Sequence, residues 1–323
     1  MRFYWIDVAR LFFAFLVVTV HVPLLGGGII HPIACLAVPF FYVTTGFFVW
    51  HDDELKFNTQ LRKSFKNYVS LYGVYFLAIS AICWCLKLIY HNEFDFSVGN
   101  LLDLFWTYGN SSLVDAVDVN GRHFGISTLW FLYGGILSIG ILFVCRRHLF
   151  KHWFKFLIIF IWVAYAVINT ERQTVYLPRT IGASLPYLYA GIMLRRGLNS
   201  IDISKPKLLL ILVLLVICLY VEEYLFHPIG YARVMLLPTI IVLFYALTKL
   251  KGGSFIKKIP IRTSFDIYVW HRFLYIVSSG ILGLYLYKLD SILIYFIIFI
   301  CSLFIRRLLH DKSNKTNVLC KQI

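Results

Sequence analysis

Charged side chains are scarce in this sequence. Asp, Glu, Lys and Arg make up only 15% of its 323 residues, whereas 60% are hydrophobic and the mean hydropathy is +0.76. This balance excludes a soluble domain of the same length, which needs more polar residues to cover its surface. The sequence therefore predicts a polytopic integral membrane protein of the all-α class.

A polar linker, a helix repeat and a second, soluble domain are also lacking, so we expect a single membrane domain over residues 1–323. A membrane-spanning helix needs about 20 apolar residues, and some are shorter or tilted. About ten transmembrane helices are predicted on this criterion. The candidate spans fall roughly at 5–25, 33–50, 68–90, 127–145, 152–168, 181–195, 207–224, 231–249, 266–287 and 291–309.

Acidic residues are few, 16 against 31 basic residues, which gives a net charge of +15. If the N-terminus is cytoplasmic, all but six basic residues fall in inside segments; the exceptions are Lys87, Arg122, Arg172, Arg179, Arg233 and Lys288. The positive-inside rule then places both termini in the cytoplasm. The basic excess indicates orientation and attraction to anionic membrane lipids, and no recognition motif accompanies it that would indicate nucleic acid.

The cysteine pattern lacks the features of a disulfide or zinc framework. The chain has seven cysteines, an odd number, and most of them lie inside apolar runs. They are expected to be small packing residues, and no bound metal is expected.

Two ionisable residues stand out in the first apolar run. Arg10 and His21 are eleven residues apart, and every residue between them except Thr19 is apolar. Eleven residues make roughly three helical turns, so both side chains project from one face, about 16 Å apart along the axis. Ionisable groups in a span normally point into the protein interior or a wet cavity. The pair therefore predicts a polar path that enters the bilayer from one side.

Five motifs follow one another along the chain: WIDVAR with the later His21, VPFFYVTTGFFVW, RKSFKNY, STLWFL and SFDIYVWH. Together they resemble the acyltransferase 3 family of membrane acyltransferases, and they extend from about residue 5 to 271. A chain of this kind is most similar to the stand-alone surface-glycan O-acetyltransferases of that family. The resemblance implies a multi-pass protein of the bacterial inner membrane. It also implies transfer of an acyl group, usually acetyl, from cytoplasmic acetyl-CoA to a hydroxyl of a glycan or lipid-linked sugar.

This chemistry gives the first two residues their expected roles. An alcohol that attacks a thioester needs a base, and imidazole titrates near neutral pH, so His21 is the expected general base. Its alternative is a structural histidine satisfied by a neighbouring helix. Arg10, near the inner mouth, suits a phosphate or a pantetheine amide of the CoA donor. Its alternative is a topology anchor that is paired with Asp7.

Further basic residues are expected to contact the donor. Arg62, Lys63 and Lys66 precede the third span and offer a cationic rim to nucleotide phosphates, although the plain positive-inside interpretation stays open. The family usually has arginine where this chain has Lys66, and lysine does not form the same paired hydrogen bonds. His271, near the inner end of the ninth span, either contacts CoA or caps a helix.

Four residues are candidates for binding the acceptor. Thr45 carries a hydroxyl beside Gly46 in the second span, where it either orients a substrate or His21 or serves helix packing alone. Trp130 lies early in the fourth span, where it either stacks on a sugar or belongs to the interfacial aromatic belt. Glu222 and Glu223 end the seventh span on the outer side, where a carboxylate binds sugar hydroxyls, orients the base or is simply exposed. His31 is expected to be exposed in a short outer loop.

Transport is the rival function class. Helices with buried charge also suit a multi-pass transporter or a flippase for a small solute or a lipid-linked sugar. The sequence shows neither an internal two-fold repeat nor an acid cluster at the bilayer midplane for ion coupling. A non-catalytic membrane partner is a third class, and it leaves Arg10 and His21 unexplained. Consumption of acetyl-CoA distinguishes the enzyme from both alternatives.

Overall fold

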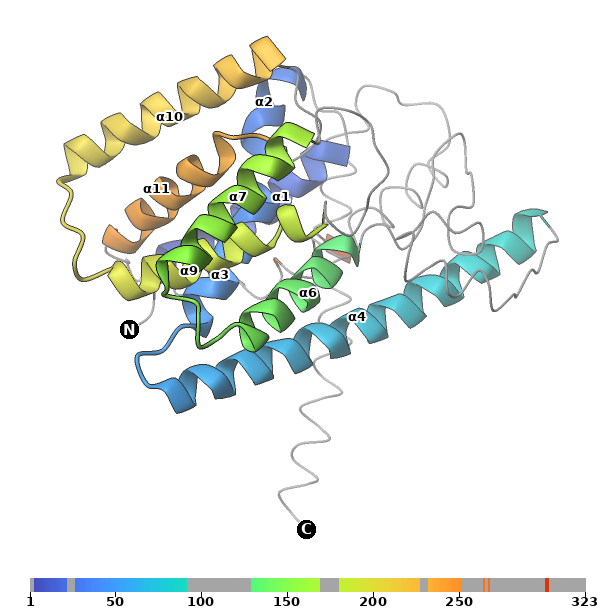
Figure 1. The fold of residues 1–323 in the computed structure, drawn as a ribbon. Coiled ribbons are helices and arrows are strands. Elements are labelled where there is room, and N and C mark those ends of the chain that lie inside the picture. The colour runs from blue at the N-terminus through green and yellow to red at the C-terminus, as the bar shows by residue number, and fades with distance from the viewer. Residues whose placement is uncertain are drawn as a thin grey trace.

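The computed structural model describes residues 3–21, 27–91, 129–168, 180–226 and 232–250, together with 264, 267, 300 and 301. All regular secondary structure in these residues is helical, which confirms the all-α prediction (Figure 1). The helices are α1 (Tyr4–His21), α2 (Gly27–Ala34), α3 (Ala37–Val49), α4 (Glu54–His91), α6 (Trp130–Val144), α7 (His152–Ile168), α9 (Leu185–Gly197), α10 (Lys205–Phe226) and α11 (Leu236–Lys249).

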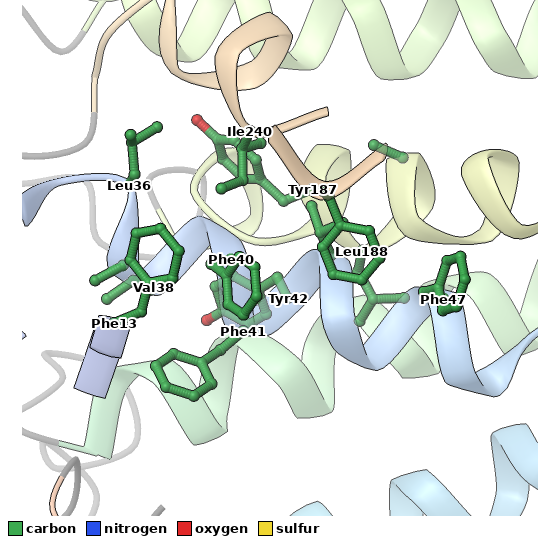
Figure 2. Packing of buried hydrophobic residues seen from close by; sticks show 14 of the residues in the cluster. Phe13, Leu36, Val38, Phe40, Phe41, Tyr42, Phe47, Tyr187, Leu188 and Ile240 are labelled. Carbon is green, nitrogen blue, oxygen red and sulfur yellow. The ribbon is translucent and has the colours of Figure 1, made fainter. Parts of the chain in front are cut away.

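Helix α3 forms the centre of the bundle. It packs on α1, α4, α9 and α11, most extensively on α9. Nearly all of its residues are buried, because it is apolar on every side. Its aromatic side chains contact those of neighbouring helices. Phe40 stacks on Phe13 of α1 with ring centroids 4.5 Å apart (Figure 2). The ring centroid of Phe47 lies 5.0 Å from that of Phe244 of α11.

Two glycines let α3 and α9 approach each other closely. A Cβ atom on Gly46 would overlap the carbonyl oxygen of Leu188 and lie 2.9 Å from its carbonyl carbon. A Cβ atom on Gly191 would overlap the carbonyl oxygen of Val43 and lie 2.7 Å from the Phe47 nitrogen. The two backbones are therefore in direct contact, as in the small-residue crossings typical of membrane helices.

Helix α4 begins at a side-chain cap. Asp53 Oδ1 accepts hydrogen bonds from the backbone N–H groups of Leu55, at 2.8 Å, and Lys56, at 3.1 Å. These bonds satisfy N–H groups that have no partner in the first turn of a helix. They favour the charged carboxylate, so the Lys56 N–H and then the Leu55 N–H hold the pKa of Asp53 below its usual value.

Large apolar side chains cover the outside of the bundle. Only Leu208 and Leu219 of α10 are buried, and α7 exposes Phe156 and Phe160. Exposed apolar surface of this extent marks contact with another apolar phase. Among the described residues, Ile30–Val49 and Lys205–Phe226 are long and apolar enough to cross a membrane, and three shorter apolar helices accompany them. The count of ten spans stays a prediction, since the segment 92–128 and most residues after 250 lie outside the described part.

The bundle has two chemically different ends. Helices α3, α9 and α11 end, and α4 and α10 begin, at one end, which we call the basic end. Arg195 lies there with its guanidinium 5.4 Å from the ring of Phe3, and Arg196 lies 4.0 Å from the ring of Phe150. At the opposite end, called the far end below, α1 and α10 end and α2 and α11 begin. Helix α1 therefore runs from the basic end to the far end.

Candidate functional site

A cavity of about 330 Å³ lies between α1, α3, α4 and α6. It is called the Arg10 pocket below, because Arg10 is the one cationic residue among the described residues that line it. The lining residues are Arg10, Phe41, Thr44, Thr45, Phe48, Val49, Gln60, Ser64, Asn67, Tyr68, Leu71, Phe131 and Leu132.

The Arg10 pocket is elongated along the helices. On α4 its lining extends from Gln60 to Leu71, a rise of about 16 Å. On α3 it extends from Val49, near the basic end, to Phe41, which lies toward the far end. The lining is polar beside α4 and apolar toward Phe131. A slender ligand with its polar part nearer the basic end matches this distribution.

One face of α4 supplies the neutral polar groups of the pocket. Gln60, Ser64, Asn67 and Tyr68 stand at positions i, i+4, i+7 and i+8, which places them on one side of the helix. Sequence reasoning missed these residues, because they lie in a basic segment and two of them, Gln60 and Asn67, are exposed at the edge of the pocket. The helical spacing of hydroxyl and amide side chains between the basic residues is the signal that could have found them.

Thr45 lies on the wall of the pocket, and its hydroxyl is part of a hydrogen-bonded pair. Its Oγ1 donates to the carbonyl oxygen of Phe41 at 3.0 Å and lies 2.8 Å from the hydroxyl of Tyr68. Since a hydroxyl has one proton, Tyr68 is the donor of the second bond. The neighbouring Thr44 donates to the carbonyl of Phe40 at 2.7 Å. The pair fixes Tyr68 against α3. The predicted role of Thr45 in substrate binding stays a prediction.

Arg10 projects from α1 into this pocket, and not all of its guanidinium N–H donors are used. Its nearest guanidinium nitrogen lies 3.8 Å from Asp7 Oδ1, so the expected ion pair is present, but the distance is longer than a hydrogen bond. Its Nε is buried and has no hydrogen-bond partner among the described residues. Guanidinium N–H groups in a partly buried cleft bind carbonyl or phosphate oxygens well. Arg10 is therefore able to bind a ligand while Asp7 stays beside it.

The second residue of the predicted pair lies at the other end of the same helix. Helix α1 is continuous from Tyr4 to His21, so the axial separation of about 16 Å between residues 10 and 21 holds. The side chain of His21 lies outside the described residues, and so does the whole of His271. Their predicted roles as general base and donor contact stay predictions.

The three basic residues of the RKSFKNY motif do not line the Arg10 pocket. Arg62, Lys63 and Lys66 are all exposed on α4, and the Arg62 guanidinium lies 5.4 Å from the ring of Phe143. They lie at the same levels along α4 as the pocket lining, between Gln60 and Leu71, but project from other faces of the helix. Contact with CoA phosphates stays a prediction for these residues and concerns a site outside the pocket.

Trp130 is the first residue of α6 and is partly buried. It packs beside Tyr165, Ala183 and Ala232, and its chain neighbour Phe131 lines the Arg10 pocket. The packing gives Trp130 a structural partner. Its predicted contact with the acceptor is a separate question that this packing does not decide.

The two glutamates at the end of α10 have different partners. Glu222 accepts hydrogen bonds from the backbone N–H groups of Val234, at 2.5 Å, and Met235, at 2.8 Å, and so caps the start of α11. Glu223 forms an ion pair with Arg233, whose side chain is fully buried. Neither carboxylate is merely exposed at a loop. Acceptor binding by Glu222 and Glu223 stays a prediction.

The prediction that His31 lies in a loop is wrong. His31 lies in helix α2 and not in a loop, and its Nδ1 is 3.4 Å from Glu223 Oε1. The three glycines before it, Gly26, Gly27 and Gly28, favoured a loop. The helix nevertheless begins at Gly27 and continues past Pro32, which removes one backbone N–H donor from this short helix.

Comparison with known proteins agrees with the motif analysis. A family model described as an acyltransferase domain, that of the acyltransferase 3 family, matches residues 3–306. No curated protein and no solved structure matches the chain. The family and the apolar helices together indicate a membrane-bound acyltransferase. Because the match includes nearly the whole chain, the protein belongs to the acyltransferase 3 family.

Proposed function

We propose that the protein transfers an acetyl group from cytoplasmic acetyl-CoA to a hydroxyl of a cell-surface glycan or lipid-linked saccharide. The observation that carries this proposal is the elongated Arg10 pocket, built on the same helix that ends at His21. The proposed location is the bacterial inner membrane, which the chain crosses about ten times with both termini in the cytoplasm. The basic end is then the cytoplasmic end.

The dimensions of the pocket support a pantetheine arm as its occupant. The arm of CoA has about twelve bonds between its diphosphate and its sulfur, and at the extension of a stretched peptide these reach about 14 Å. Residues 10 and 21 are separated by about 16 Å along α1. An arm whose phosphate end contacts Arg10 therefore brings its thioester close to the level of His21.

The lining of the pocket also suits this arm. Pantetheine contains two amides and a hydroxyl, and Asn67 and the hydroxyls of Tyr68 and Thr45 offer neutral donors and acceptors at the level of Arg10, whereas Gln60 and Ser64 lie nearer the basic end. Phe41 and Phe131 surround the part of the pocket nearest the far end, where the apolar end of the arm would lie. Arg62, Lys63 and Lys66, exposed on the other faces of α4, are the proposed contacts for the nucleotide phosphates.

The proposed chemistry needs one base. The acceptor hydroxyl oxygen attacks the thioester carbonyl carbon while the imidazole of His21 takes the hydroxyl proton. The carbon–sulfur bond then breaks, and the leaving CoA thiolate takes the proton back from His21. The products are an acetyl ester and free CoA, and the imidazole is regenerated.

The purified full-length protein, incubated with acetyl-CoA and alkali-treated, de-O-acetylated surface glycan, tests the proposal. Release of free thiol together with acetyl ester on the glycan is the expected result. An exposed arginine at the basic end supplies the control, since Arg147→Ala should release thiol at the wild-type rate. Absence of thiol release by wild-type protein, or transport of the saccharide without it, would overturn the proposed function.

A further inference from the structure

A polar cluster occupies the far end of the bundle, away from the Arg10 pocket. It consists of Arg233, Glu223, His31, Cys35 and Tyr187, which come from α2 and the turn after it, the start of α9, the end of α10 and the segment before α11. The residues are far apart in sequence, since Arg233 contacts positions about 200 residues earlier. We call this group the Arg233 cluster. The Arg10 pocket does not include any of its members.

Arg233 is the buried centre of the cluster, held in place by its partners. Its side chain has no exposed surface. Its Nε donates to Glu223 Oε2 at 2.9 Å, and one terminal nitrogen contacts the same oxygen. The other terminal nitrogen donates to Cys35 Sγ at 3.2 Å. A buried ion pair is tolerated when its remaining donors are also satisfied, and this arrangement holds the guanidinium in one orientation.

His31 and Glu223 form an exposed edge beside this buried centre. The side chain of His31 is 37% exposed and that of Glu223 is 26% exposed. His31 Nδ1 lies 3.4 Å from Glu223 Oε1 and also 3.4 Å from a terminal nitrogen of Arg233. It donates to the carboxylate when it carries the proton and accepts from the guanidinium when it does not, so either tautomer holds the ring in place. Its Nε2 makes only a 3.9 Å contact with Cys35 Sγ. One carboxylate oxygen and one imidazole nitrogen therefore keep hydrogen-bonding capacity toward an external ligand.

Tyr187 adds an unsatisfied group to the cluster. It is fully buried, and its hydroxyl has no hydrogen-bond partner among the residues that the structure describes. It interacts electrostatically with Cys35, Arg233 and Glu222. Buried polar groups in native proteins nearly always have partners, and an exception calls for an explanation such as a bound molecule. Glu222 does not supply the partner, because both of its oxygens cap α11.

We propose that the His31–Glu223 edge is a subsite for hydroxyl groups of the saccharide acceptor, with Arg233 as its positioning residue. This inference rests on the proposed function. The positive charge of Arg233 offsets the negative charge of Glu223, so the subsite suits a neutral polyol better than an anion or a cation. A carboxylate oxygen accepts hydrogen bonds from sugar hydroxyls, and an imidazole nitrogen donates to or accepts from them.

The position of the subsite agrees with this role. Helix α2, which carries His31, packs on α1 and begins six residues after His21, the last residue of α1. The subsite therefore belongs to the end of α1 at which the proposed base lies, and the donor enters from the opposite end. An acceptor bound there approaches from the extracytoplasmic side.

Substitutions on the full-length enzyme separate acceptor binding from donor binding. His31→Gln and Glu223→Gln are expected to raise the KM for de-O-acetylated glycan about tenfold or more, because a hydrogen bond to the acceptor is lost. The KM for acetyl-CoA should change less than about twofold, by the same relation. His152→Gln is the matched control, since His152 is exposed at the start of α7, near the basic end. Unchanged acceptor KM in both variants would overturn the inference.

Arg233→Lys tests the positioning role. Lysine keeps the charge but loses the planar set of donors that holds Glu223 and Cys35, so the KM for glycan should rise while acetyl-CoA affinity is retained. A merely structural role would instead lower donor affinity and acceptor affinity together. That second outcome would remove Arg233 from the proposal.

A measurement on wild-type protein avoids the question of folding in the variants. Diethyl pyrocarbonate modifies exposed imidazoles, and mass spectrometry reads the extent at each histidine. De-O-acetylated glycan should slow modification of His31 and leave that of His152 unchanged. Equal rates at His31 with and without glycan would exclude the subsite. This readout needs no acetyl transfer. Absence of protection at His31 therefore contradicts the subsite alone, whereas absence of thiol release contradicts the proposed function.

Discussion

The contact between α3 and α9 makes Gly46→Ala the most direct test of the packing. The added methyl group would overlap the carbonyl oxygen of Leu188 and lie 2.9 Å from its carbonyl carbon and 3.2 Å from the nitrogen of Ile192. All three atoms belong to the backbone of α9, so no side chain can rotate away. The two helices must separate, or the carbonyl must tilt, to make room.

The magnitude follows from the distances. Carbon atoms in contact are normally about 3.5–4.0 Å apart, so α3 and α9 must move apart by roughly 0.6–1 Å. Overpacking of this kind lowers the free energy of unfolding by about 1–3 kcal/mol or more. The better helix propensity of alanine offsets about 1 kcal/mol of that loss. We expect a net destabilisation of about 2 kcal/mol, in the upper part of this range because backbone cannot repack.

Gly73→Ala is the matched control. Gly73 lies in α4, and a Cβ atom there meets nothing within 4 Å. This variant should gain stability from helix propensity, by about 0.5–1 kcal/mol. Unfolding in detergent, followed by circular dichroism, measures both changes. A Gly46→Ala protein as stable as wild type would refute the inferred backbone contact.

Four further predictions concern the site and the topology. Arg10→Ala should weaken acetyl-CoA binding by about 1.5–3 kcal/mol in a titration with folded protein, whereas Arg147→Ala should not. Equal affinities of wild type and Arg10→Ala would reduce Arg10 to a topology anchor. His21→Gln should lower acetyl transfer by roughly 10²–10⁴-fold while donor binding survives, and near-normal transfer would make His21 structural. The stabilisation by the Asp53 cap should be fully present above the usual aspartate pKa of 3.8 and be lost as the pH falls through the lower pKa of Asp53 in the folded protein. The unfolding curves of wild type and Asp53→Ala should therefore converge in acid, and a stability difference that does not change with pH would contradict the cap. A reporter fused after Ile323 should be cytoplasmic, and an extracytoplasmic signal would overturn the proposed orientation.

The sequence predicted those features that depend on local composition. Apolar runs predicted helices, and the spacing of Arg10 and His21 predicted that both belong to one helix, which α1 confirms. Arg10 lines a pocket as expected, because a guanidinium on an apolar helix is far more stable in a polar cleft than in lipid. The ion pair with Asp7 follows from i,i+3 spacing alone.

Features that depend on which helices meet were missed. Ser64, Asn67 and Tyr68 lie among lysines and arginines, so the sequence alone did not distinguish the face of α4 that turns inward. The position of α6 decides that face: Tyr68 packs near Phe131 with ring centroids 6.1 Å apart. Packing partners distant in sequence carry no local pattern, and only the fold shows them.

Arg233 is an exception to the positive-inside rule that has a structural explanation. It is one of the six basic residues that the positive-inside rule does not place in the cytoplasm, and the structure buries it completely. The positive-inside rule does not account for a basic residue at the far end, so another interaction must explain it. Its ion pair with Glu223 is that interaction. Such exceptions are therefore useful candidates when a membrane sequence is searched for buried polar sites.

The apolar layer between the two ends constrains how the proposed reaction proceeds. Phe40 stacks on Phe13 and lies 5.5 Å from Phe244, while Phe41 lies 6.0 Å from Phe131 at the apolar part of the Arg10 pocket. Packed aromatic rings exclude water and ions, so a wide channel between the two ends would have to disrupt this core. A slender acyl arm needs only a narrow path along α1. In the proposed mechanism, the pantetheine arm would carry the acetyl group along this path while the nucleotide of CoA stays at the basic end.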